Sequence, residues 1–214
     1  MEELVNMLFR WGHVLVGITW IGLLYYFNFV QTEYFKEAEE NARKDAVAKL
    51  APRALWWFRW AAFFTFLTGL YLLYAITLRV NLDIIFGVTM GTFMMLNVWG
   101  IIWPNQKIVI GLKEGDAAIA GPKAALASRT NTLFSLPMLY FMVSSTHLPH
   151  GGYLLSQGDM SMSSTAFLVG ILIILAIEAN AIWGKMFGVI TSVRDVIISG
   201  FVLTVILSSI AFYL

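Results

Sequence analysis

The sequence contains no cysteine and few charged residues, and each absence excludes a class of protein. Without cysteine, the 214-residue chain has no disulfide, thiolate metal site, cysteine nucleophile or covalently attached c-type haem. Charged residues make up 13% of the chain, against about 25% in a soluble domain. The net charge of +1 predicts no nucleic-acid partner. The sequence also lacks a phosphate-binding loop, a hydrolase triad and a carboxylate cluster.

Long apolar runs dominate the rest of the sequence. Hydrophobic residues account for 59% of the chain, and several runs approach the roughly 20 apolar residues that cross a bilayer. This pattern predicts an all-α integral membrane bundle of about six transmembrane helices, forming a single domain over residues 1–214. The expected helices cover about 4–30, 54–78, 82–103, 130–146, 165–184 and 196–214.

The segments between these helices carry local signals of their own. We expect Pro104 to end the third helix, because proline lacks the backbone N–H that continues a helix. Residues 31–53 are predicted to form a charged helical linker, and residues 104–129 a basic loop. Gly87 and Gly91 form a GxxxG pattern, which indicates a close contact between helices.

Lysine and arginine are distributed unevenly between the two sides of the predicted bundle. Because basic loops stay cytoplasmic, we expect both termini and the loop 147–164 to face outward, into the periplasm of a bacterium with an outer membrane. The chain is therefore predicted to be a multi-pass protein of the bacterial inner (cytoplasmic) membrane. Arg10 and Arg79 lie on the outer side. The other basic residues, all on the inner side, are Lys36, Arg43, Lys44, Lys49, Arg53, Arg59, Lys107, Lys113, Lys123, Arg129, Lys185 and Arg194.

The histidines fall at the outer side of this topology. His13 lies near the outer start of the first helix, and His147 and His150 follow the fourth. Imidazoles from facing helices of a bundle hold b-type haem, since nitrogen ligands suit iron. We therefore expect about one haem b per chain, with His13 and His147 ligating the iron and His150 as the alternative to His147. A packing hydrogen bond at His13 and loop exposure of the other two are the alternatives.

Four further residues are candidates for the haem pocket. Arg10 and Arg79 lie at the level where haem propionates would emerge, and a guanidinium pairs well with a carboxylate. Gly17 and Trp20 follow His13 at i+4 and i+7, so a gap and an aromatic wall share its helix face. Interfacial arginines also reach for lipid headgroups, and glycine or tryptophan in a membrane helix also serves packing. The sequence identifies no catalytic residue.

Two other chemistries are open. Met160 and Met162 lie in the same outer loop as two histidines, and thioether and imidazole together suit copper(I). In that case the chain would be a copper-binding or structural membrane subunit of a larger complex. Within the membrane, Glu178 is a candidate proton relay, with hydrogen bonding to a structural partner such as Asn97 as the alternative.

The sequence resembles one family over about residues 8–150. Its motifs are similar to those of the membrane domain of bacterial membrane-bound urate oxidase (urate hydroxylase, PuuD type). Several stretches recur in the same order, which is more specific than any single motif. The stretches are RWGH at 10–13, GITWIGLLYYFNFVQ at 17–31, NVWGIIWPNQK at 97–107 and SRTNTLFSLPMLYFM at 128–142, followed by His147.

The resemblance implies a membrane domain that passes electrons to a periplasmic cytochrome c. The full-length enzymes carry a C-terminal cytochrome c domain with a Cys-x-x-Cys-His site, which this cysteine-free sequence lacks. A separate periplasmic cytochrome c or a respiratory complex is therefore the expected partner, and urate or a quinol the expected reductant. Whether the chain is an oxidoreductase or an electron-transfer subunit stays open, as does its oligomeric state. The first helix is also distantly similar to the haem-binding protoporphyrinogen oxidase of the HemJ type, which is a further alternative.

Overall fold

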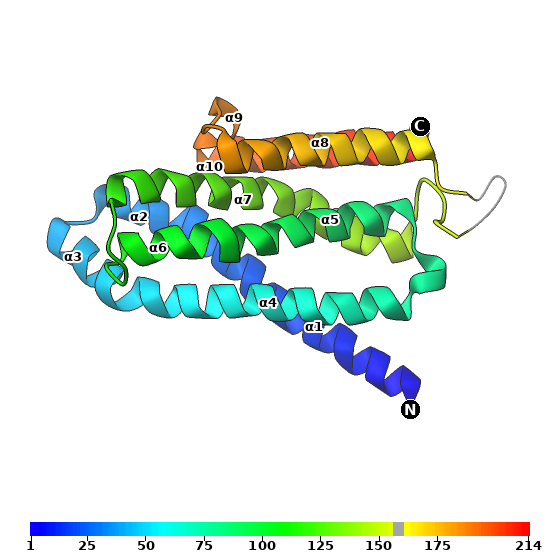
Figure 1. Cartoon of the computed structure of the whole chain (residues 1–214), viewed down its shortest axis with the longest axis horizontal. Helices are drawn as coiled ribbons and strands as arrows, with labels where there is room; N and C mark the ends of the chain where they lie inside the picture. The colour runs from blue at the N-terminus through cyan, green and yellow to red at the C-terminus, as the bar shows by residue number, and fades with distance from the viewer. Residues whose placement is uncertain (156–160) are drawn as a thin grey trace.

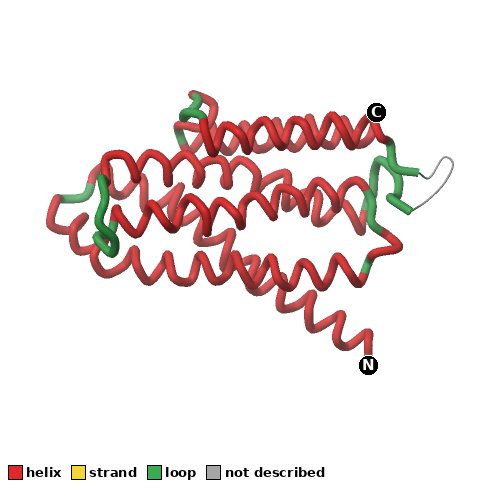
Figure 2. The backbone as a smooth tube through the Cα atoms, in the orientation of Figure 1, coloured by secondary structure: helices red, strands yellow, loops and turns green. Residues whose placement is uncertain are grey.

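The computed structural model describes residues 1–155 and 161–214 and is helical almost throughout (Figure 2). Within these residues, extended pairing is limited to the isolated bridges Asn81–Tyr153 and Tyr153–Ser161. The predicted all-α class is confirmed. The helices are α1 (Glu2–Tyr25), η1 (Tyr26–Gln31), α2 (Thr32–Glu37), α3 (Glu40–Asp45), η2 (Ala46–Leu50), α4 (Ala51–Ala75), η3 (Thr77–Arg79), α5 (Leu82–Asn97), η4 (Val98–Ile102), α6 (Trp103–Val109), α7 (Ala117–His147), α8 (Ser164–Trp183), α9 (Gly188–Thr191) and α10 (Val193–Tyr213), where η1, η2 and η4 are π-helical and η3 is a 3-10 helix.

The long helices form an elongated bundle with α5 and α7 in the middle (Figure 1). The helices α1 and α4 pack together on one side, and α8 and α10 lie on the other, with α10 against α7. Both termini and the connection from α7 to α8 lie at one end. The linker around α3, the loop between α6 and α7, and α9 lie at the opposite end. This is the division that the basic residues predicted, whereas the side of the membrane that each end faces stays a prediction.

Several helical stretches are long and apolar enough to cross a membrane, which indicates a membrane protein. The helix α7 is not among them, although it lies at the centre of the bundle and has 31 residues. Its sequence is rich in serine and threonine, which lower its hydropathy. The number of transmembrane helices and the kind of membrane therefore stay predictions. The qualifying stretches in the described residues are Glu2–Glu37, Glu40–Ala75, Leu82–Val109, Ser164–Trp183 and Val193–Tyr213.

The predicted end of the third helix at Pro104 is wrong. The helix continues through η4 and α6 to Val109, with Pro104 in the first turn of α6. Inside a regular α-helix, a proline removes one backbone hydrogen bond and its ring meets the carbonyl group four residues earlier. The π-helical turn of η4 directly precedes α6 and shifts this register, so the proline is accommodated without ending the helix.

Most of the loop predicted over 104–129 is also helical. The helix α7 begins at Ala117, where the Asp116 side chain accepts a hydrogen bond of 2.8 Å from a backbone N–H of the first turn. A stripe of small residues at helical spacing then packs α7 against α6. Sequence analysis missed this segment because alanine marks a membrane helix more weakly than larger apolar residues do. The buried residues of the stripe are Ala120, Ala124 and Ala127.

The other predicted helices agree with α1, α4, α8 and α10 to within a few residues at most ends. The first of them runs on from α1 through η1 into α2 without a break, so its inner end lies further along the chain than predicted. The linker 31–53 is helical as predicted, with a change of direction at Ala38, whose backbone is extended.

Glycines allow α5 to approach its neighbours closely. A Cβ on Gly87 would lie 3.4 Å from both Met142 N and Phe141 Cβ of α7, which confirms the contact predicted from the GxxxG pattern. On the α8 side, a Cβ on Gly170 would lie 2.1 Å from Phe86 Cζ. The Phe86 ring therefore fills space that a side chain at position 170 would occupy. These contacts fix α5 between α7 and α8.

Candidate functional site

His13 lies on the face of α1 that packs against α4. Its Nδ1 is 2.9 Å from the Thr68 hydroxyl, which donates to the Phe64 carbonyl at 2.7 Å. The tautomer that satisfies both contacts has Nδ1 donating to Thr68, and in it Nε2 is the unprotonated nitrogen. A Cβ on Gly69 would lie 3.2 Å from His13 Cε1, so glycine makes room for the ring. Thr68 and Gly69 therefore set the position of the imidazole in the contact between α1 and α4.

Gly17 and Trp20 follow His13 on the same face of α1. A Cβ on Gly17 would lie 3.9 Å from Thr65 Cγ2, so this position serves the packing of α1 on α4. Trp20 is 2% exposed, and no described residue accepts a hydrogen bond from its indole N–H. In most buried tryptophans the indole N–H donates a hydrogen bond. Trp20 therefore belongs to the core and carries an unused donor two helical turns from His13.

Arg10 and Arg79 are exposed, the first in α1 and the second in η3. Within the described residues neither forms an ion pair. The first turns of α1 are held on α4 by a ring stack of Phe9 on Tyr71, with centroids 3.8 Å apart, and by a 2.9 Å hydrogen bond from the Tyr71 hydroxyl to Asn6. Both guanidinium groups are accessible to an anion, and their pairing with haem propionates stays a prediction.

His147 is the last residue of α7 and is exposed. Its Nδ1 lies 2.9 Å from the Thr146 hydroxyl and 3.0 Å from the Val143 carbonyl, both in its own helix. The bond to the carbonyl requires Nδ1 to donate, so Nε2 is again the acceptor nitrogen. Among the residues that the structure describes, none outside α7 forms a hydrogen bond with this ring. Its orientation therefore depends on α7 alone.

His150 is held by a buried carboxylate that sequence analysis missed. Its backbone N–H and its Nδ1 each lie 3.2 Å from Asp83 Oδ2, and the two side chains are 8% and 0% exposed. The His150 ring also packs edge-on against Phe212 of α10, with centroids 5.3 Å apart. A carboxylate that binds one ring nitrogen orients the other toward a ligand or a proton. The available signal was an acidic residue in the first turn of an apolar helix, two positions after its Asn81 cap.

The chain around His150 is tied to neighbouring helix ends. The Asn81 side chain donates to the Ser145 carbonyl at 2.7 Å, which joins the start of α5 to the end of α7. The Leu82 N–H donates to the Gly152 carbonyl at 3.3 Å. Gly152 has a φ of 77°, in the left-handed region that favours glycine, and this turn brings the chain back toward α5. The position of His150 is therefore set by backbone contacts as well as by Asp83.

The copper alternative concerns residues of the same outer connection. Met160 lies outside the described residues, and Met162 packs against the hydrophobic core. In residues 1–155 and 161–214, no group of three or more histidine, aspartate or glutamate side chains is arranged to hold a metal ion. Copper binding stays a prediction.

The three histidines occupy separate environments. His13 lies in the contact between α1 and α4, His147 at the end of α7, and His150 between the start of α5 and the end of α10. Within the described part of the chain, no hydrogen bond or ring contact joins His13 to either of the others. His13 could supply one nitrogen ligand to a haem, and this role stays a prediction. A second ligand from His147 or His150 stays a prediction.

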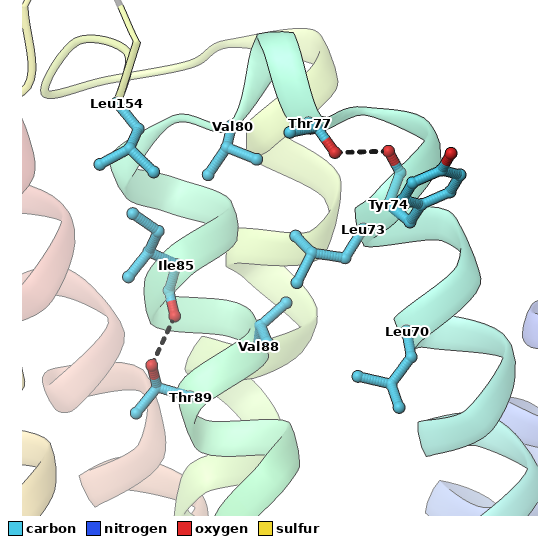
Figure 3. Close-up of a pocket in the computed structure, with 9 residues that line it drawn as sticks. All are labelled: Leu70, Leu73, Tyr74, Thr77, Val80, Ile85, Val88, Thr89 and Leu154. Carbon is cyan, nitrogen blue, oxygen red and sulfur yellow. Dashed lines mark hydrogen bonds between the residues drawn. The ribbon is translucent and has the colours of Figure 1, made fainter.

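An apolar groove of about 500 Å³ lies between α4 and α5 (Figure 3). Its two threonines, Thr77 and Thr89, donate to the carbonyls of Tyr74 and Ile85 at 2.6 and 2.7 Å, so their hydroxyls are satisfied locally. None of its lining residues is a histidine, and the groove offers no ligand for a haem iron. The lining residues are Leu70, Leu73, Tyr74, Thr77, Val80, Ile85, Val88, Thr89 and Leu154.

A second polar region lies between α5, α7 and α8, near the ends of α5 and α8 that lie away from the chain termini. Asn97 Nδ2 donates to Asn131 Oδ1 and to Glu178 Oε2, each at 3.0 Å. Asn131 Nδ2 donates to the Met94 carbonyl at 2.9 Å. Asn97, Asn131 and Glu178 are each at most 5% exposed. The hydrogen bond between Asn97 and Glu178 confirms the structural partner that the sequence suggested.

Further buried polar groups lie on the side of α7 that faces α1. The Tyr25 hydroxyl lies 2.9 Å from Ser135 Oγ, and Asn28 Nδ2 donates to Ser128 Oγ at 2.8 Å. Asn28 is part of η1, and η4 begins directly after Asn97, so two π-helical turns flank this interior. Such turns are rare and occur often at functional sites. The stretches 17–31, 97–107 and 128–142, which carry the family resemblance, each contribute residues to these two buried polar regions.

Comparison with known families supports the resemblance over part of the chain. Residues 80–174, slightly less than half of the sequence, match the family described as Urate oxidase N-terminal. The match includes Asn97, Asn131 and both outer histidines, and it ends before Glu178. It does not distinguish between types within the urate oxidases. Searches of curated proteins and of solved structures found no match.

Proposed function

We propose that this chain is a membrane redox domain related to urate oxidase, in which His13 ligates a haem b and electrons leave at the outer face. The reductant is urate or a quinol, and the acceptor is a periplasmic cytochrome c or a respiratory complex. The observation that carries the proposal is the His13 imidazole, which Thr68 holds between apolar helices with Nε2 in no described hydrogen bond. The family match over residues 80–174 supports the relation to urate oxidase.

The residues around His13 would bind and orient the haem. A haem b accepts and passes on single electrons when bound. Thr68 fixes the imidazole tautomer, and Gly69 leaves room for the ring. Arg10 and Arg79 carry the positive charge that propionate groups require.

A second residue from the connection between α7 and α8 would hold the haem together with His13. His150 is the better oriented of its two histidines, because Asp83 holds Nδ1 and leaves Nε2 as the acceptor. His147 offers the same nitrogen from the end of α7, without support from another helix. Replacing His147 and replacing His150 are therefore expected to change haem binding to different extents.

Variants of the three histidines test the proposal. We expect His13→Ala to abolish haem retention in the purified protein. Of His147→Ala and His150→Ala, the variant that removes the second ligand is expected to retain less haem and to change a low-spin spectrum to a high-spin one. The other serves as its matched control. Equal haem content in His13→Ala and the wild type would contradict the proposal, and copper found by metal analysis instead of haem would favour the copper alternative.

A further inference from the structure

Glu178 is a buried carboxyl group that the proposed haem chemistry does not use. It is 5% exposed and lies on α8, five residues before the helix ends at Trp183, or about 8 Å along the helix axis. Its Oε2 accepts one hydrogen bond of 3.0 Å, from Asn97 Nδ2. Among the described residues, none donates a hydrogen bond to Oε1. A carboxylate normally accepts several hydrogen bonds, so this group is poorly solvated for a negative charge.

Charged groups of the neighbouring helices do not compensate Glu178. The helices α5, α7 and α10 pack against α8. On α5, Asp83 is at the opposite end and paired with His150. On α10, Asp195 lies in the first turn beside Arg194 and is bonded to Ser192.

The charged groups of α7 are directed elsewhere. Arg129 precedes Asn131 by two positions, which places it on another face of α7, and no described hydrogen bond or ion pair joins it to Glu178. Lys123 lies in the exposed first turns of α7, and His147 at its last residue. The titratable Tyr140 of α7 and Tyr213 of α10 form no hydrogen bond with Glu178 in the described residues. Its one described side-chain partner is therefore the neutral amide of Asn97.

We propose that Glu178 is a proton-binding site inside the membrane domain, with Asn97 as the residue that positions its carboxyl group. The proton sits on Oε1, while Oε2 keeps the hydrogen bond from Asn97. A neutral acid at this position avoids the cost of an uncompensated buried charge. The short distance to the end of α8 provides exchange with the inner face. The second N–H of the Asn97 side chain donates to Asn131 Oδ1, which holds Asn97 in place.

Proton binding and a purely structural role predict different protonation states of the Glu178 carboxyl group. As a structural acceptor, an ionised Glu178 would serve Asn97 equally well, and no proton would be bound. As a proton-binding site, the group is a carboxylic acid at neutral pH. This difference is independent of haem binding, so failure of one proposal leaves the other intact.

Infrared spectroscopy of the full-length protein in lipid at neutral pH tests the proposal. We expect the carbonyl stretching band of a protonated carboxylic acid, sensitive to exchange into D2O, and its loss in Glu178→Gln. The glutamine keeps the size of the side chain and an oxygen that accepts from Asn97. The matched control is Glu40→Gln, which removes an exposed carboxylate paired with Lys44 and should leave the band unchanged. An identical band in Glu178→Gln and the wild type would overturn the proposal.

A chemical measurement on the wild type covers the case in which Glu178→Gln does not fold. A hydrophobic carbodiimide adds to protonated carboxylic acids in apolar surroundings and forms a stable N-acylurea without an oxidant or reductant. We expect the peptide that contains Glu178 to gain the mass of the carbodiimide, and the exposed Glu40 to remain unmodified. An unmodified Glu178 peptide, recovered under conditions in which the reagent labels a known membrane carboxyl, would contradict proton binding.

Discussion

Replacing Thr68 by valine removes the group that orients His13 while keeping the shape of the side chain. In the structure, His13 Nδ1 donates to the Thr68 hydroxyl at 2.9 Å. Valine fills the same space without an acceptor, so the hydrogen bond between the imidazole and the hydroxyl is lost inside the contact between α1 and α4. The ring can then rotate or adopt the other tautomer, and Nε2 no longer points consistently toward a ligand.

The expected magnitude follows from this single contact. A lost hydrogen bond of this kind contributes about 1 kcal/mol, and removal of the partner that orients a metal-binding histidine lowers affinity about 10- to 100-fold. A tenfold change corresponds to about 1.4 kcal/mol. We therefore expect Thr68→Val to weaken haem binding by about 1.4–2.8 kcal/mol while the protein stays folded.

The assay is the rate of haem transfer from the purified protein to an excess of apomyoglobin, followed in the visible spectrum. Thr65→Val is the matched control, since it makes the same change one turn away on α4, where the hydroxyl donates to the Ala61 carbonyl at 2.7 Å and forms no side-chain bond to His13. Faster haem loss in Thr68→Val than in Thr65→Val is the expected result. Equal rates in the two variants and the wild type would refute the orienting role of Thr68.

Two further predictions concern packing and topology. Gly170→Ala should lower the melting temperature markedly, because its Cβ would lie 2.1 Å from Phe86 Cζ, and overpacking typically costs about 1–3 kcal/mol; Gly121→Ala, which meets nothing within 4 Å, should have little effect. Equal melting temperatures would contradict the tight contact between α8 and α5. The cysteine-free chain also allows single cysteines to be labelled with a membrane-impermeant maleimide. Arg79→Cys should react in intact cells and Lys113→Cys after permeabilisation, and the reverse pattern would overturn the predicted orientation.

The helices could be predicted from the sequence because their signals are local. Runs of apolar residues mark α1, α4, α8 and α10, and the basic residues correctly group the connections into two ends of the bundle. The errors occur where the signal is weak or ambiguous. Pro104 ends a helix in most contexts, and here the π-helical turn before it changes the backbone register. The first part of α7 buries alanines, which carry little hydropathy.

Sequence spacing predicted which residues share a helix face with His13, and it did not predict the contacts that these residues make. The helical spacing placed Gly17 and Trp20 on the face of His13, since periodicity depends on neighbouring residues alone. The hydrogen bond from His13 to Thr68 spans 55 positions in the chain, and the pair of His150 with Asp83 spans 67. Such partners depend on how helices pack, which no local pattern encodes. The separation of His13 from the outer histidines is a result of the same packing.

The measurement that tests the central claim most directly is the visible spectrum of the detergent-purified protein, oxidised and then reduced with dithionite, with a pyridine haemochrome assay of stoichiometry. With adequate haem supply during expression, we predict the reduced alpha band of a b-type haem at about one haem per chain. A colourless wild-type protein under these conditions would contradict haem binding, and with it the proposed redox function.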